Sequence, residues 1–133
     1  MAEFPSVSHV AVTVTDLSVS VPWYQRLFGV VPALDEDVPG GLHHTVFPLA
    51  GGMQFGLVTH PETTGDHVFN ECRAGMDHVG FACTSRDELV AWQAKLDEFG
   101  IAHGEIVDAH FGSGLAFRDP DNIALEFFAP PTQ

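Results

Sequence analysis

The chain of 133 residues has few basic side chains. Five Lys and Arg stand against 18 Asp and Glu, which gives a formal net charge of −13 at pH 7. Binding to nucleic acid or to an anionic membrane needs clusters of Lys and Arg, so the composition argues against both partners. The same shortage makes a polyanionic substrate hard to hold.

Cysteine and long apolar runs are also scarce. The two cysteines, Cys72 and Cys83, are too few for a disulfide framework. No apolar run reaches the roughly 18 residues of a membrane span. The segment Met1–Pro5 lacks the basic and apolar regions of a signal peptide. These absences predict a cytoplasmic protein, and the length predicts one domain with a real core.

The chain does contain an internal repeat, in which Met76–Cys83 resembles Val7–Val12 and His78 takes the place of His9. In both halves, a β-rich segment precedes apolar residues at helical spacing and three short extended runs. We therefore predict an α+β fold with two tandem βαβββ modules. The modules occupy about 6–59 and about 76–129, with a linker at about 60–75, and form a single domain over 1–133.

Capping residues and prolines place the boundaries of the two helices. Asp16 and Ser20 are both candidate N-caps of the first helix. Pro22 fits only the first turn of a helix, so this helix is predicted to begin near 20–21 and to stop at Gly29. Ser85 and Glu88 form a capping box for the second helix.

The second module is predicted to end in three strands, near 103–107, 113–118 and 123–128. Pro120 and Asn122 favour a tight turn before the last of them, with Asn122 in a left-handed conformation. One carboxylate, Glu126, lies inside that apolar strand. An ionised Glu there costs several kcal/mol unless it is paired, bound to metal or facing a wet cavity.

Alternation along the strands predicts a site. One face carries bulky apolar residues and packs under the helices, whereas the other carries mostly small residues. The polar residues on this second face, one in each of four strands, are His9, Gln54, His78 and Glu126. Two imidazoles, a carboxylate and an amide oxygen suit a divalent transition metal with open positions. Gln54 fits either as a direct ligand or as a hydrogen-bonding partner of a ligand.

Four motifs span nearly the whole chain: His9-Val10-Ala11-Val12 before Asp16-Leu17, Trp23-Tyr24 with Leu27-Phe28-Gly29-Val30, Asp77-His78-Val79-Gly80-Phe81, and Phe117-Arg118-Asp119-Pro120-Asp121 leading to Leu125-Glu126. Together they resemble the vicinal oxygen chelate superfamily. This superfamily includes glyoxalase I, extradiol dioxygenases, fosfomycin-resistance enzymes, methylmalonyl-CoA epimerase and bleomycin-resistance proteins.

The resemblance implies a U-shaped mixed sheet around a central metal site, with helices on the outer face. A homodimer is expected, because it buries the exposed edges of the sheet. The set His9, Gln54, His78 and Glu126 is similar to the metal set of methylmalonyl-CoA epimerase. Glyoxalase I usually has Glu at the Gln54 position, and fosfomycin-resistance enzymes use the positions of His9, His78 and Glu126. The site can be completed within one chain or shared by two.

The implied activity is that of a metal-dependent enzyme with isomerase, lyase or dioxygenase chemistry. The implied cofactor is one divalent transition metal: zinc, nickel, cobalt, manganese or ferrous iron. Because cations are few, the expected substrate is small, neutral or mono-anionic, and carries adjacent oxygens, as in a dicarbonyl, a hydroxy acid or a catechol-like compound.

Candidate bases are His44, by loose alignment with the epimerase, and Glu126, by leaving the metal. The expected substrate contacts are Thr13, Phe47, Phe128 and Arg118. A non-catalytic binding protein is the alternative: bleomycin-resistance proteins are acidic and dimeric and bind a cationic drug. The set of metal-binding residue types favours the enzyme, and metal content distinguishes the two.

Overall fold

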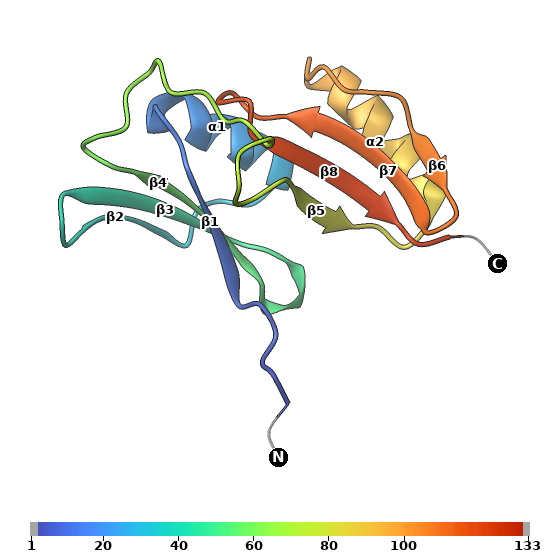
Figure 1. Cartoon of the computed structure of the whole chain (residues 1–133), viewed down its shortest axis with the longest axis horizontal. Helices are drawn as coiled ribbons and strands as arrows, with labels where there is room; N and C mark the ends of the chain where they lie inside the picture. Colours follow the sequence, from blue (N-terminus) through green and yellow to red (C-terminus); the bar gives the residue numbers. More distant parts are fainter. Residues whose placement is uncertain (1–2, 132–133) are drawn as a thin grey trace. The chain divides into compact units, whose positions relative to one another are not determined.

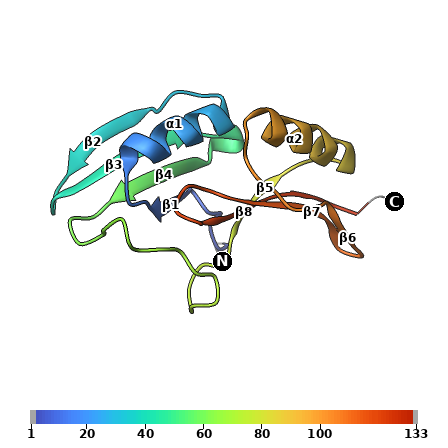
Figure 2. The ribbon, with the colours of Figure 1, turned by 90° about the horizontal axis from the view of Figure 1, so that it is seen from above.

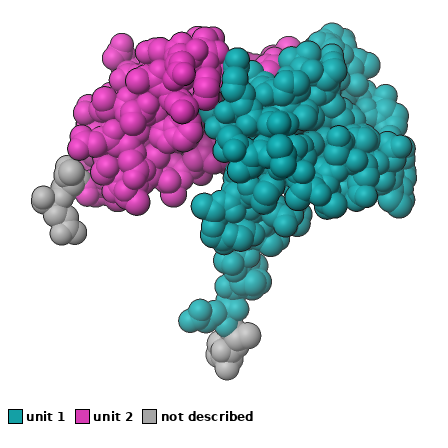
Figure 3. Space-filling view, turned by 180° about the vertical axis from the view of Figure 1, so that it is seen from behind, with its two compact units in different colours: residues 1–67 teal, residues 68–133 magenta. Residues whose placement is uncertain are grey.

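The structure is a computed structural model that describes residues 3–131, and it divides into two compact units, Met1–His67 and Val68–Gln133 (Figure 3). The boundary between the units falls inside the linker expected at about 60–75. The order strand, helix and three strands occurs in each unit (Figure 1). The α+β fold of two tandem βαβββ modules is therefore confirmed.

The first unit consists of β1 (His9–Thr13), α1 (Leu17–Phe28), β2 (Leu34–Val38), β3 (Leu42–Pro48) and β4 (Gln54–Thr59), with a short 3₁₀ turn at Ala50–Gly52. The second consists of β5 (Val79–Ala82), α2 (Arg86–Glu98), β6 (Val107–Ala109), β7 (Gly112–Arg118) and β8 (Ala124–Ala129). None of the helices in residues 3–131 has the length and hydrophobicity needed to cross a lipid bilayer.

The two sheets have the same topology. Their strand orders are β1-β4-β3-β2 and β5-β8-β7-β6. The first strand of each unit pairs in parallel with the last, and the remaining pairs are antiparallel. The helix of each unit lies on one face of its own sheet (Figure 2). This leaves the other face of each sheet for the small and polar residues predicted to lie there.

Aromatic residues fill the core under each helix. In the first unit, Tyr24 of α1 is fully buried and its ring lies 5.3 Å from that of Phe55 in β4. In the second unit, Trp92 of α2 stacks on Phe127 of β8 with ring centroids 4.3 Å apart. Because side chains alternate along β8, burying Phe127 against the helix turns Glu126 to the opposite face.

The predicted start of α1 was wrong. The helix begins at Leu17, a full turn before Pro22, because Asp16 is the N-cap and its carboxylate accepts hydrogen bonds from the Ser18 amide and hydroxyl groups. Pro22 therefore lies inside the helix, where it removes one backbone donor. The predicted end was correct, since Gly29 has a left-handed φ of 69°.

Two further details differ from expectation. Ser85 caps α2 as predicted, but the Glu88 carboxylate accepts hydrogen bonds from Thr84 rather than completing the capping box on Ser85. The strand predicted near 103–107 is observed at Val107–Ala109 instead. Within the predicted range, His103 forms only a single isolated bridge, with Phe117 of β7.

The turn that leads into β8 is held by a buried carboxylate. Asp119 is 6% exposed, and its Oδ1 accepts hydrogen bonds of 2.8 Å from the amides of Asp121 and Ile123. Asn122 has a φ of 67°, the left-handed conformation predicted for it. The turn therefore has a fixed geometry, and it sets the start of the strand that carries Glu126.

Candidate functional site

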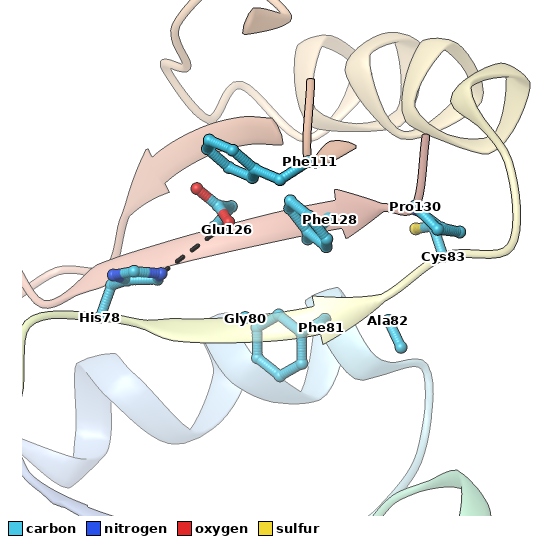
Figure 4. A pocket seen from close by; sticks show the side chains of 9 residues that line it. All are labelled: His78, Gly80, Phe81, Ala82, Cys83, Phe111, Glu126, Phe128 and Pro130. Atoms are coloured by element: carbon cyan, nitrogen blue, oxygen red, sulfur yellow. Dashed lines mark ion pairs between the residues drawn. The ribbon is translucent and has the colours of Figure 1, made fainter. Parts of the chain in front are cut away.

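His78 and Glu126 come together in the second unit. His78 directly precedes β5, and Glu126 projects from the middle of β8 (Figure 4). The distance from His78 Nε2 to Glu126 Oε1 is 3.8 Å. His78 Nδ1 lies 2.7 Å from the carboxylate of Asp77. A carboxylate can only accept, so this hydrogen bond requires a proton on Nδ1, and in neutral imidazole Nε2 then carries the free lone pair.

Gly114 of β7 gives the Glu126 carboxylate its space. A Cβ atom at position 114 would lie 3.1 Å from Glu126 Oε2 and 3.2 Å from its Cδ. Those separations are shorter than ordinary van der Waals contact. The absence of a side chain at Gly114 therefore helps to determine where the carboxylate lies.

A cavity of about 630 Å³ opens beside this pair. His78 and Glu126 supply its polar groups, and its other lining residues include Phe111, Phe128, Cys83 and Pro130 (Figure 4). Burial raises the pKa of the Cys83 thiol to about 11, so the thiol stays neutral at physiological pH. The cavity thus combines a metal-binding type of pair with an apolar wall.

The first unit contains the other predicted pair. His9 of β1 and Gln54 of β4 are directly paired residues in adjacent parallel strands, so both lie on the same face of the sheet. Nδ1 of His9 lies 2.7 Å from the Ser8 hydroxyl. In both units, the residue that precedes the histidine therefore contacts Nδ1, which leaves Nε2 as the nitrogen for a ligand.

Gln54 and Glu126 do not occupy equivalent positions in the two sheets but differ by two residues in register. Gln54 pairs with His9, whereas Glu126 pairs with Gly80, two positions beyond His78. A shift of two keeps every side chain on the same face of a strand. Glu126 therefore still faces the cavity, and it reaches His78 diagonally across the two strands.

Each unit contributes one pair: His9 with Gln54 from Met1–His67, and His78 with Glu126 from Val68–Gln133. Across residues 3–131, no group of three or more His, Cys, Asp and Glu side chains is placed to hold a metal ion. The donor types of the two pairs fit a divalent transition metal, since imidazole, carboxylate and amide oxygen are all ligands of such ions.

His44 lies on the same face as Gln54 but far along the sheet. His44 pairs with Val58, and Val58 pairs with Thr13, so Thr13 and His44 occupy one row. Four residues separate Val58 from Gln54 along β4, which corresponds to about 13 Å. His44 Nε2 also lies 3.2 Å from the Glu36 carboxylate of the neighbouring strand. Thr13 and His44 therefore lie in one row of this face, remote from Gln54.

Two expected substrate contacts have other partners. Phe47 is fully buried and packs edge-on against Phe28 of α1, so its ring belongs to the core and we do not retain it as a substrate contact. Arg118 forms two hydrogen bonds, of 2.8 and 3.0 Å, with the carboxylate of Glu71. This guanidinium lowers the pKa of Glu71 to about 2. Phe128, in contrast, lines the cavity as expected.

Sequence reasoning missed two residues of this site, Asp77 and Gly114, and considered Phe111 only as an aromatic residue of a binding groove. The Asp77-His78 dipeptide was visible, but nothing in the sequence shows that a carboxylate contacts the neighbouring ring. Gly114 lies against the Glu126 carboxylate because of the pairing of β7 with β8, and Phe111 lines the cavity from the tight turn before β7. The alternation of glycines in Gly112-Ser113-Gly114 was the one available signal for a close approach between strands.

Comparison with known proteins assigns the family. A family model described as the Glyoxalase/Bleomycin resistance protein/Dioxygenase superfamily matches residues 6–127. A crystal structure of a glyoxylase/bleomycin resistance protein/dioxygenase domain from Frankia sp. EAN1pec is 32% identical in sequence. It superposes with a TM-score of 0.86, and the match covers 97% of this chain and 100% of that one.

More distant structures share the fold. A glyoxalase family protein from Enterococcus faecalis is 20% identical, with a TM-score of 0.75 over 94% of this chain and 98% of that chain. The fosfomycin resistance protein FosX from Listeria monocytogenes, solved as a mutant with Mn(II) and 1S,2S-dihydroxypropylphosphonic acid, is 18% identical. Its TM-score is 0.72 over 97% of this chain and 95% of that chain.

A search of curated protein sequences gives no significant match. The family model nevertheless covers most of the chain, the Frankia domain matches it over nearly its full length, and the tandem βαβββ topology agrees with both. The chain belongs to the Glyoxalase/Bleomycin resistance protein/Dioxygenase superfamily.

Proposed function

We propose that this protein is a metal-dependent enzyme that acts on a small substrate with adjacent oxygens, by isomerase, lyase or dioxygenase chemistry. The proposed ligands are His78 and Glu126, completed by His9 and Gln54. The proposed ion is one divalent transition metal, chosen among zinc, nickel, cobalt, manganese and ferrous iron. The Mn(II) in the FosX structure supports a divalent ion in this fold. A homodimer in the cytoplasm remains part of the proposal.

One observation carries this proposal: the free nitrogen of His78 and the carboxylate of Glu126 converge on the same cavity, 3.8 Å apart. That separation leaves room for an ion between the two groups, because each metal–ligand bond is about 2.0–2.2 Å long. Asp77 holds the opposite ring nitrogen, as carboxylates commonly do for histidine ligands of metals.

A bound divalent ion would act as a Lewis acid toward the substrate oxygens. The residues of the chain have separate tasks. Asp77 fixes the tautomer of His78 through Nδ1. Gly114 leaves space for the Glu126 carboxylate beside His78, and Glu126 would be a candidate proton acceptor by leaving the metal. His44 is the candidate acceptor for a carbon farther away. Turnover in His44→Ala, which leaves all four proposed ligands in place, tests His44: unchanged turnover would remove His44 and leave Glu126 as the candidate base.

Elemental analysis tests the proposal, with protein purified without a metal-affinity column and then incubated with each candidate ion. We expect about one transition-metal ion per chain and its loss in His78→Gln and Glu126→Gln. His60→Gln is the matched control, because it removes an exposed histidine outside every strand and helix. Metal retained in His78→Gln and Glu126→Gln would remove this pair from the site.

The alternative function is a non-catalytic, acidic binding protein of the bleomycin-resistance type. The observation in its favour is that no three His, Cys, Asp and Glu side chains among residues 3–131 are placed to hold a metal ion. The net charge of −13 suits a cationic ligand. Protein that binds none of the candidate ions, but binds cationic aromatic drugs with measurable affinity, would establish this alternative.

A further inference from the structure

An aromatic side chain at the mouth of the cavity has no role in the core. Phe111 lies in the tight turn between β6 and β7 and is 63% exposed. Its ring is nearly parallel to that of Phe128, with an interplanar angle of 14° and centroids 6.4 Å apart (Figure 4). His110 contacts the ring edge-on at 5.3 Å. A Phe that stays largely exposed beside a cavity retains apolar surface that a ligand can cover.

Gly112 fixes the position of this turn against Phe128. Its φ of 143° is unfavourable for residues with a side chain. A Cβ atom there would lie 2.4 Å from both Phe128 Cζ and the Ala129 carbonyl oxygen. The backbone of the turn therefore packs directly on the Phe128 ring. Phe111 is held next to that ring by the chain path.

The wall of the cavity formed by Phe111 and Phe128 offers no counter-charge to an anion. The cavity lining includes neither Lys nor Arg, and its only carboxylate is Glu126. Two cations of the second unit are held elsewhere: Arg86 forms hydrogen bonds of 2.8 and 3.1 Å with Asp108, and Arg118 pairs with Glu71. An anionic group bound along Phe111 and Phe128 would lose its hydration without gaining an ion pair.

We propose that the cavity of the second unit binds an uncharged aromatic group of the substrate along Phe111 and Phe128. The adjacent oxygens of the substrate then lie at His78 and Glu126. This inference rests on the proposed function and adds a substrate class to it. Phe111 and Phe128 are specificity-determining residues, because they contact the ring and take no part in the chemistry at the oxygens.

Two hydroxamic acids with the same chelating group test this proposal. Benzohydroxamate and acetohydroxamate both bind a metal through two adjacent oxygens and differ only in a phenyl or a methyl arm. By calorimetry on the Mn(II)-loaded protein, we expect benzohydroxamate to bind roughly tenfold more tightly, the order expected when one more ring is covered by aromatic surface. Adding a 4-carboxylate to benzohydroxamate is expected to remove this advantage.

Two variants test whether Phe111 causes the preference for the phenyl arm. Phe111→Ala should remove most of the preference for the phenyl arm while leaving the affinity for acetohydroxamate unchanged. Val107→Ala is the matched control, since Val107 is an equally exposed apolar residue of the same hairpin, at 66% exposure, and does not line the cavity. Because Phe111 is mostly exposed, its truncation should leave the fold intact, and circular dichroism checks this.

The outcomes separate this inference from the proposed function. Equal affinity for the two hydroxamates, or an unchanged preference in Phe111→Ala, would overturn the aromatic subsite and leave the metal site standing. When neither hydroxamate binds, metal-free protein is titrated with benzamide and acetamide by NMR. Shifts at Phe111 and Phe128 with benzamide alone would support the subsite and reject the metal enzyme. No shift with either amide would reject both.

Discussion

Two glycines help to determine where the side chains of this site lie. A Cβ atom built on Gly114 would lie 3.1–3.2 Å from the Glu126 carboxylate, and one built on Gly112 would lie 2.4 Å from the Phe128 ring. Gly114 has an ordinary negative or extended φ, whereas Gly112 does not, with a φ of 143°. Of the two, therefore, only Gly114 can be replaced by Ala without backbone strain.

Replacing Gly114 with Ala should weaken metal binding with little effect on stability. The new methyl group forces the flexible Glu126 carboxylate to move by a few tenths of an ångström, away from its position beside His78. We expect metal affinity to fall roughly tenfold, as for other changes that displace a metal ligand. The free energy of unfolding of the metal-free protein should change by less than about 1 kcal/mol.

Isothermal titration with Mn(II) or Zn(II) measures the first effect, and urea unfolding measures the second. Gly104→Ala provides the control in the same unit, because the nearest atom to its new Cβ is 3.9 Å away. Identical metal affinities in wild type and Gly114→Ala would show that Gly114 does not position Glu126.

At the scale of elements, the sequence was sufficient for the type and order of the helices and strands, and insufficient for their ends. Alternation along the strands placed Glu126, His78 and Gln54 on the correct faces. The start of α1 was missed because a good N-cap, Asp16, outweighs the cost of an internal Pro22. The register between β5 and β8 was missed because it depends on hydrogen bonding between distant segments, which local sequence does not encode.

The link between α2 and β6 contains a charged histidine. His103 Nδ1 lies 2.7 Å from the Gly104 carbonyl oxygen, and Nε2 lies 2.7 Å from the Asp97 carboxylate of α2. Both partners only accept hydrogen bonds, so both ring nitrogens must carry protons. The Gly104 carbonyl, followed by Asp97 and the nearby charge of Glu105, raises the pKa of His103 above 6.5.

This histidine should make stability depend on pH. Because its pKa is higher in the folded state, its contribution to stability is fully present below about pH 6.5. That contribution is lost as the pH rises through the folded-state value. We expect the difference in unfolding free energy between wild type and His103→Gln to be largest near pH 6 and to shrink toward pH 9.

Urea unfolding at a series of pH values between 6 and 9 measures this difference. His60→Gln serves as the comparison, since His60 is exposed and lies outside the helices and strands. A difference between wild type and His103→Gln that stays constant over the series would mean that His103 contributes through packing alone.

At the scale of the whole molecule, the four proposed metal ligands are divided between the two units. His9 and Gln54 belong to Met1–His67, and His78 and Glu126 belong to Val68–Gln133. The sequence repeat predicted this division, since each module carries one histidine at the start of its first strand. The repeat could not show whether both pairs bind the same metal ion, because a repeat in the sequence does not specify how its two copies are arranged.

Hydrogen exchange answers this question by measuring where a metal stabilises the chain. An ion that binds only the folded state adds about 2.7 kcal/mol at 100 times its dissociation constant, which slows roughly 100-fold the amides that exchange by local opening of the strands holding the ion. If all four residues hold the same ion, we expect slower exchange in β1 and β4 as well as in β5 and β8. Mg²⁺ is the control ion, because it prefers oxygen ligands and should give little protection. Protection restricted to β5 and β8, and unchanged by His9→Ala, would assign the metal to His78 and Glu126 without His9 and Gln54.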